Sequence, residues 1–232
     1  MSAELRARLA DVRERIARAA DRAGRDPSHI RLVAVSKTFD ADRVRAAADA
    51  GQIDFGENRV QEALAKIDRT SDLRLRWHLI GHLQSNKARK AAERFHTIHS
   101  LDDAGLGEKL DRDAADFART VEGLVQVDLA GEPTKHGALE PDLPALFEQA
   151  RAWRACRLVG LMILPPATEA PEQARPYFRA LKSVRDRLLS GGADPAMLAE
   201  LSMGMSHDFE IAVEEGATLV RVGTAIFGSR TK

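Results

Sequence analysis

Lys37 is the side chain whose surroundings in the sequence most suggest covalent chemistry. It follows Ser36 and the apolar, β-branched run 30–35, which is typical of a buried strand. A lysine that projects from the end of such a strand into a partly desolvated pocket has a lowered pKa and can attack an aldehyde. The same position also suits an ordinary lysine in solvent or in a salt bridge. Lys37 is therefore a candidate nucleophile.

A second candidate is an anion-binding loop. Residues 203–206, Met-Gly-Met-Ser, precede a predicted helix, and residues 222–224, Val-Gly-Thr, follow a further apolar run. Glycine allows close backbone approach, Ser206 offers a hydroxyl, and the start of a helix offers free N–H groups. These features predict a phosphate cup, although Ser206 could also serve only as a helix cap. Asp208 and Glu210 would have to point away from a bound dianion.

Other chemistries find little support. The seven histidines show no His-x-His or His-Glu-x-x-His spacing, and Cys156 is the single cysteine, so we predict no metal site. The sequence contains neither a Gly-x-Gly-x-x-Gly motif after a strand nor a P-loop motif. With 35 basic and 35 acidic residues the net charge is zero, which argues against binding nucleic acid as the main role.

The elements that must position these residues alternate regularly. Short apolar runs predict strands at residues 30–35, 53–55, 76–80, 97–99, 124–127, 158–164, 198–202 and 219–222. Helical patterns lie between them at residues 41–50, 60–67, 86–94, 104–117, 143–152, 172–189 and 209–215. Eight such units in this length predict an α/β fold, a (β/α)8 TIM-type barrel. An open doubly wound sheet is the alternative.

An extra helix precedes the first predicted strand. Apolar residues recur at steps of three and four from Leu5 to Ala19, which indicates an amphipathic helix over residues 1–24, packed outside the barrel. No linker or low-complexity segment follows. We therefore expect residues 1–232 to form a single domain.

In such a barrel the chemistry lies at the carboxyl ends of the strands, where these polar residues fall. The blocks that carry a resemblance are 34–37 (AVSK), 55–62 (FGENRVQE), 77–87 (WHLIGHLQSNK), 160–162 (GLM), 201–206 (LSMGMS) and 220–228 (VRVGTAIFG). With these blocks in this order, the sequence resembles the pyridoxal-phosphate homeostasis protein family, also called PROSC-like or YggS-like. The resemblance extends over nearly the whole chain.

The resemblance implies a barrel of the kind found in the N-terminal domain of alanine racemase, with pyridoxal 5'-phosphate (PLP) as cofactor. Lys37 would form an internal aldimine with PLP. Ser206 and the backbone of Gly223 and Thr224 would hold the phosphate. A loop over residues 128–137 also resembles the family, and its Lys135 is the alternative lysine to test.

The resemblance further implies contacts around the cofactor ring. Arg221 would face the pyridine nitrogen, and Asn58 would lie near the ring. Met203 and the turn at Gly81 and His82 would line the pocket.

The family resemblance implies a PLP carrier that supplies PLP to apo-enzymes. Racemisation needs a second base, which a tyrosine of a second domain provides in the racemase family. Here Tyr177 falls in the helix 172–189, and Cys156 precedes the sixth predicted strand at the opposite end. A cation such as Arg221 disfavours protonation of the ring nitrogen, which makes the ring a poorer electron sink and limits side reactions. The racemase family shares this feature.

Two alternatives to a carrier without catalytic turnover remain open. One is a PLP-dependent racemase or related enzyme that uses water or a histidine as second base. The other is a phosphosugar-type barrel enzyme without PLP.

The expected location is the cytoplasm. The N-terminus lacks the apolar segment of a signal peptide, and the longest apolar run is much shorter than the ~18 residues of a membrane span. A single cysteine is compatible with a reducing compartment. We expect no membrane partner and a monomer or weak dimer.

Overall fold

Eight parallel strands close into a barrel in the computed structural model, which describes residues 2–129, 131, 136–167 and 169–228. The strands are β1 (Arg31–Val35), β2 (Asp54–Glu57), β3 (Arg76–Leu79), β4 (Thr97–Leu101), β5 (Val121–Gln126), β6 (Cys156–Met162), β7 (Glu200–Met205) and β8 (Leu219–Val222). They pair in chain order, and β8 pairs with β1 to complete the ring. The predicted TIM-type barrel is confirmed.

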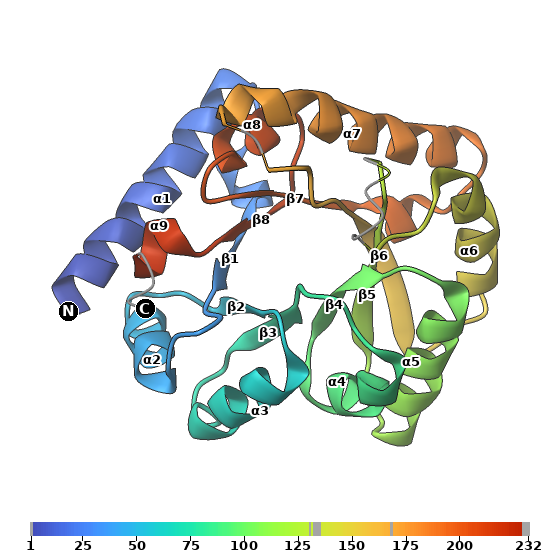
Figure 1. Cartoon of the computed structure of the whole chain (residues 1–232), viewed down its shortest axis with the longest axis horizontal. Coiled ribbons are helices and arrows are strands. Elements are labelled where there is room, and N and C mark those ends of the chain that lie inside the picture. Colours follow the sequence, from blue (N-terminus) through green and yellow to red (C-terminus); the bar gives the residue numbers. More distant parts are fainter. Residues whose placement is uncertain (1, 130, 132–135, 168, 229–232) are drawn as a thin grey trace.

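Helices surround this barrel on the outside (Figure 1). They are α1 (Ser2–Arg22), α2 (Ala41–Asp49), α3 (Val60–Arg69), α4 (Ala88–Arg94), α5 (Ala104–Asp116), α6 (Leu143–Ala150), α7 (Arg175–Ser190), α8 (Phe209–Glu214) and α9 (Thr224–Phe227). Two of them begin where an aspartate accepts a backbone N–H, Asp40 for α2 and Asp103 for α5. Of the described helices, none is long and apolar enough to cross a membrane.

The N-terminal helix lies outside the barrel, against α8 and α9 (Figure 1). Its apolar stripe is buried, with Leu9 only 1% exposed. On its polar side Arg15 bonds to Glu210 at 3.0 Å and Arg22 to Glu214 at 2.9 Å. The helix predicted over residues 1–24 is thus observed, and it braces the two helices that follow β7 and β8.

The core has two layers. A large apolar cluster fills the space between strands and helices, while a small one of Val33, Leu124, Met162 and Leu219 lies inside the barrel. The strand alternation that sends these four side chains inward also sends polar side chains inward.

Most strand boundaries differ from the prediction by one to three residues, and β5, for example, begins at Val121 and not at residue 124. β6 begins at Cys156, two residues earlier than predicted, so this cysteine lies in the strand. β7 begins at Glu200 and not at Leu198, because Pro195–Leu198 forms a 3-10 turn in which Asp194 accepts the N–H of Ala196. The predicted helix 172–189 likewise begins with a 3-10 turn, Pro171–Ala174, before α7.

Candidate functional site

The predicted site residues gather on one arc of the barrel rim. β1 lies between β8 and β2, with Ala34 opposite Val222 and Val35 opposite Gly56. Lys37 after β1 is therefore flanked by Asn58 after β2 and by Gly223 after β8. Phe39 stacks on Phe227 of α9 with ring centroids 5.1 Å apart, which joins the loop of Lys37 to the loop of Gly223.

The backbone on both sides of Lys37 is held by a buried ion cluster. Lys66 of α3 donates to the carbonyl of Ser36 at 2.7 Å, to Glu57 at 2.7 Å and to Glu62 at 2.9 Å. Glu62 in turn accepts the N–H of Thr38, whose φ of +70° lies in the left-handed region. This cluster fixes the direction in which partly buried Lys37 leaves the strand.

Sequence reasoning missed Lys66 and Glu62 as functional residues. The available signal was the position of Lys66 on the apolar face of α3, beside Ala63 and Ile67. Burial raises the pKa of Glu57, an effect that the hydrogen bonds from Lys66 and Ser36 only partly offset. The Glu57 Oε2 atom is buried and has no hydrogen-bond partner within the described residues.

Ser206 lies beside the start of α9, where the phosphate cup is predicted. The Oγ of Ser206 accepts the N–H of Gly223 at 3.0 Å and the N–H of Ala225 at 3.4 Å. Thr224 is exposed beside them as the first residue of α9. These N–H groups converge on one oxygen, which is the arrangement that a phosphate oxygen also requires.

The acidic residues next to the cup are engaged elsewhere. Asp208 accepts the N–H of Met205 at 2.6 Å, and Glu210 turns outward to Arg15 of α1. Met203 is fully buried in the large cluster between strands and helices. This position below the cup differs from the predicted position in the pocket wall, because Ser202 takes the inward direction and Met203 takes the opposite one.

Asn58 presents an unsatisfied atom at the rim. Its Oδ1 is buried without a hydrogen-bond partner in the described part of the chain. The turn after β3 approaches it closely, since a Cβ added to Gly81 would lie 2.3 Å from the Asn58 carbonyl oxygen. A buried amide oxygen without a donor is costly unless a bound molecule supplies one.

Arg221 points into the barrel interior beneath this arc. Burial lowers its pKa to about 10, and the nearby Asp208 carboxylate only partly counters the effect. Its guanidinium donates to Ser202 Oγ and, at 2.8 Å, to the carbonyl of Ile163. Arg221 is thus a buried cation held by a residue of β7 and by the residue that follows β6.

A continuous chain of buried hydrogen bonds runs inward from Arg221. Ser202 Oγ lies 2.8 Å from Nδ1 of His99, and Nε2 of His99 lies 3.0 Å from Nδ1 of His78. Nε2 of His78 lies 2.9 Å from Asp54, which also accepts from Arg76. The sequence predicted His78 only as a packed or exposed side chain.

One proton arrangement satisfies every group in this chain. Arg221 donates to Ser202, Ser202 to His99, His99 to His78 and His78 to Asp54, with both histidines neutral. Burial lowers the pKa of His99 well below its ordinary value. Burial would raise the pKa of Asp54, but hydrogen bonds from His78 and Arg76 lower it. The aligned bonds therefore link the Arg221 cation to a distant carboxylate.

The remaining candidate groups lie away from the arc or outside the structure. Cys156 begins β6 at the opposite end of the barrel, and burial raises its pKa to about 12. Tyr177 lies in the outer helix α7. Lys135, the alternative lysine, is outside the described residues.

Comparison with known proteins places the chain among PLP-related barrels. The family model for the alanine racemase N-terminal domain matches residues 7–231. The pyridoxal phosphate homeostasis protein of Aquifex aeolicus is 43% identical over 223 residues, 96% of this chain and 97% of that one. Its counterpart in Pseudomonas aeruginosa is 44% identical, over 96% and 94% of the two chains.

Solved structures give the same result. PipY of Synechococcus elongatus, solved with PLP bound, is 41% identical with a TM-score of 0.86, over 97% of this chain and 100% of PipY. An alanine racemase of Clostridium difficile has a TM-score of 0.70 at 16% identity. The likeness to this racemase, of which the chain covers 57%, extends to the fold alone.

Proposed function

Because the chain belongs to the family of pyridoxal phosphate homeostasis proteins, we propose that it binds PLP covalently through Lys37 and delivers PLP to apo-enzymes without catalytic turnover of its own. The observation that carries this proposal is the placement of Lys37 between the unsatisfied Asn58 oxygen and the N–H groups around Ser206. PLP supplies an aldehyde for the lysine and an electron-withdrawing ring. We assign the protein to the cytoplasm.

The residues on the arc have distinct roles in this proposal. Lys37 supplies the amine, and the ion cluster of Lys66, Glu57 and Glu62 orients it. Ser206 and the N–H groups of Gly223 and Thr224 bind the phosphate, as backbone N–H groups at the start of a helix do. Thr224 also closes the cup on its exposed side.

The cation of Arg221 would limit side reactions of the bound cofactor ring, and it is compatible with both a carrier and a racemase. A buried guanidinium beside a pyridine nitrogen opposes its protonation, and this weakens the ring as an electron sink.

Borohydride reduction followed by peptide mass spectrometry tests the lysine. We expect a reduced PLP adduct on Lys37 in the wild type, and no adduct at this peptide in Lys37→Ala, whose circular dichroism should be unchanged. An adduct found only on Lys135 would move the site to the other loop.

Incubation with single-enantiomer alanine or serine, followed by chiral analysis, tests the absence of turnover. A positioned base contributes about 10²–10⁴-fold to proton transfer, so racemisation should stay near the rate of free PLP. Steady turnover that disappears in Lys37→Ala would identify an enzyme, with the rim histidines His82 and His136 as the bases to replace next.

A further inference from the structure

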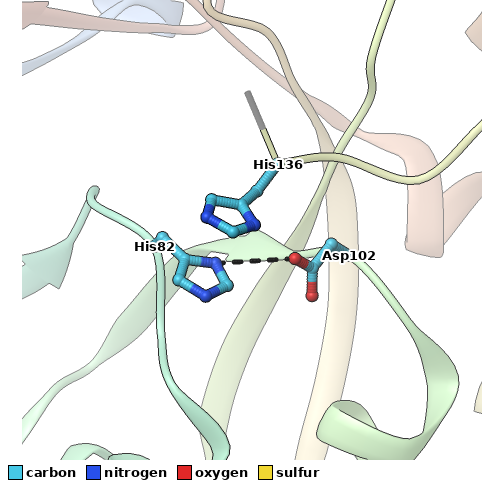
Figure 2. A group of neighbouring side chains, drawn as sticks. All are labelled: His82, Asp102 and His136. Atoms are coloured by element: carbon cyan, nitrogen blue, oxygen red, sulfur yellow. Dashed lines mark ion pairs between the residues drawn. The ribbon is translucent and has the colours of Figure 1, made fainter. Parts of the chain in front are cut away.

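Three side chains with metal-binding atoms meet on the rim next to the Lys37 arc. His82 follows β3, Asp102 follows β4, and His136 lies between β5 and α6. One ligand atom from each lies within 4.8 Å of the others. Figure 2 shows the two imidazole rings facing each other beside the Asp102 carboxylate. We propose that these three residues bind a divalent transition-metal ion, and that zinc suits them best.

The donor set fits this class of ion. Two imidazoles and one carboxylate form a familiar ligand set for zinc, with the fourth position left to water. Calcium and magnesium prefer oxygen ligands, which only Asp102 supplies here. The histidines are exposed and Asp102 is half-buried, so an ion reaches the site directly from solvent.

Small side-chain rotations bring the three groups to ligating distance. The rings stack nearly parallel at 9° with centroids 3.5 Å apart, and His82 Nδ1 lies 3.5 Å from Asp102 Oδ2. An ion must lie in the plane of each ring it binds, so the rings would turn out of this stack. Zinc–nitrogen bonds of about 2.0–2.1 Å place tetrahedral donors roughly 3.3 Å apart. The donor atoms now lie within 4.8 Å of one another, and rotations of the two exposed histidine side chains would close this gap.

The backbone that carries the three ligands is held in place. Ser100 of β4 donates to the carbonyl of Gly81 at 2.7 Å, which joins the loops of Asp102 and His82. On the other side, Gln126 of β5 donates to the carbonyl of His136. The next residues continue this anchoring, because the N–H of Ala138 bonds to the Gln126 carbonyl at 2.8 Å.

The contact between the Asp102 carboxylate and His82 is loose. The 3.5 Å contact to His82 is too long for a strong hydrogen bond. A bound cation would supply the close partner that this carboxylate lacks in the contact with His82.

Zinc titration of the full-length chain tests the site, with and without bound PLP. We expect one zinc ion per chain in both states, which separates this site from any binding by PLP itself. His136→Ala and Asp102→Asn should each weaken zinc binding at least tenfold, with unchanged circular dichroism. His29→Ala, an exposed histidine before β1 at the other end of the barrel, should bind zinc as the wild type does.

Cobalt provides a spectroscopic measurement of the same site. Co²⁺ should give visible absorption bands of a low-coordinate site, and these bands should be lost in His136→Ala and kept in His29→Ala. Zinc affinity that is unchanged in both His136→Ala and Asp102→Asn would overturn the proposal. So would the absence of stoichiometric zinc binding to the wild type.

Discussion

Ser206 occupies the centre of the proposed phosphate cup and gives the first prediction. Ser206→Ala removes a hydroxyl donor to a charged acceptor, an interaction worth ~1.5–3 kcal/mol, so PLP affinity should fall roughly ten- to a hundredfold. Pyridoxal without the phosphate should bind weakly and be nearly insensitive to the change. Equilibrium titration followed by absorbance measures both affinities.

Ser190→Ala is the matched control for this substitution. Ser190 ends α7 and bonds only locally, to the carbonyl of Asp186 at 2.9 Å. Its replacement should leave both affinities unchanged. If Ser206→Ala weakened PLP and pyridoxal equally, the phosphate would lie elsewhere.

The chain of buried hydrogen bonds that includes His99 gives a prediction about how stability depends on pH. His99 stays neutral in the folded protein because burial lowers its pKa well below the ordinary value. The unfolded chain takes up a proton near pH 6.5, so the unfolded state binds more protons and the free energy of unfolding decreases as the pH falls below that value.

Urea unfolding between pH 7 and pH 5 measures this dependence. His99→Gln removes the titrating group, so its free energy of unfolding should fall less steeply with decreasing pH than that of the wild type. His96, whose pKa burial also lowers, contributes the same sign in both proteins and cancels in the comparison. Equal slopes would show that His99 is not the group responsible.

Individual site residues were predictable where they follow a strand. Lys37 and Ser206 stand directly after apolar runs, and barrel geometry then places them on one rim. The hydrogen-bond chain through His78 was not predictable, because its members Asp54, His99 and Ser202 come from three other strands. The same is true of the cluster of His82, Asp102 and His136, whose long separations match no local metal motif.

At the scale of elements, the turn from β7 into α8 depends on Gly204. Its φ is +92°, and an added Cβ would lie 2.5 Å from the Cβ of Ala212 and 2.9 Å from the Cα of Phe209. Gly204→Ala should therefore combine backbone strain of about 1–2 kcal/mol with overpacking of about 1–3 kcal/mol. Urea unfolding measures the sum.

Gly192 separates these two contributions. It has a closely similar φ of +90°, but a Cβ added there would meet nothing within 4 Å. Gly192→Ala should show the backbone strain alone. PLP affinity should fall only in Gly204→Ala, since the turn from β7 into α8 carries Ser206. Similar destabilisation by both substitutions would mean that α8 shifts freely to accept a methyl group.

The alternation of strands and helices was predictable because buried parallel strands appear as short apolar runs. The exact first and last residues of the strands were less predictable. β7 was predicted too early because the apolar Leu198 completes a 3-10 turn that only Pro195 and the Asp194 cap define. The β7–β8 register shift between Ser202 and Met205, which brings Met205 opposite Arg221, has no counterpart in the hydrophobic pattern.

For the whole molecule, α1 braces the two helices next to the proposed phosphate cup. Leu9 is 1% exposed in the core between α1 and the rest of the protein. Leu9→Ala should lower the free energy of unfolding by about 2–5 kcal/mol, through lost burial and the cavity left behind. Chemical denaturation followed by circular dichroism measures the change.

Arg18 provides the comparison on the same helix. It forms an exposed ion pair with Glu14, so Arg18→Ala should alter the free energy of unfolding by no more than about 0.5 kcal/mol. If Leu9→Ala were equally mild, α1 would contribute little to the stability of the barrel.

The pairing of β1 with β8 has a consequence for when the protein can bind PLP during synthesis and for how fast it is degraded. Lys37 and Gly223 stand on opposite sides of the joint where the ring closes, and Leu32 meets Val220 across it. A ribosome makes Lys37 well before Gly223, so a nascent chain holds both parts of the proposed site only after β8 has emerged. PLP bound at the proposed site would then hold the two sides of this joint together. When PLP is scarce, the barrel would open more often between β1 and β8, and proteases would then degrade the protein faster.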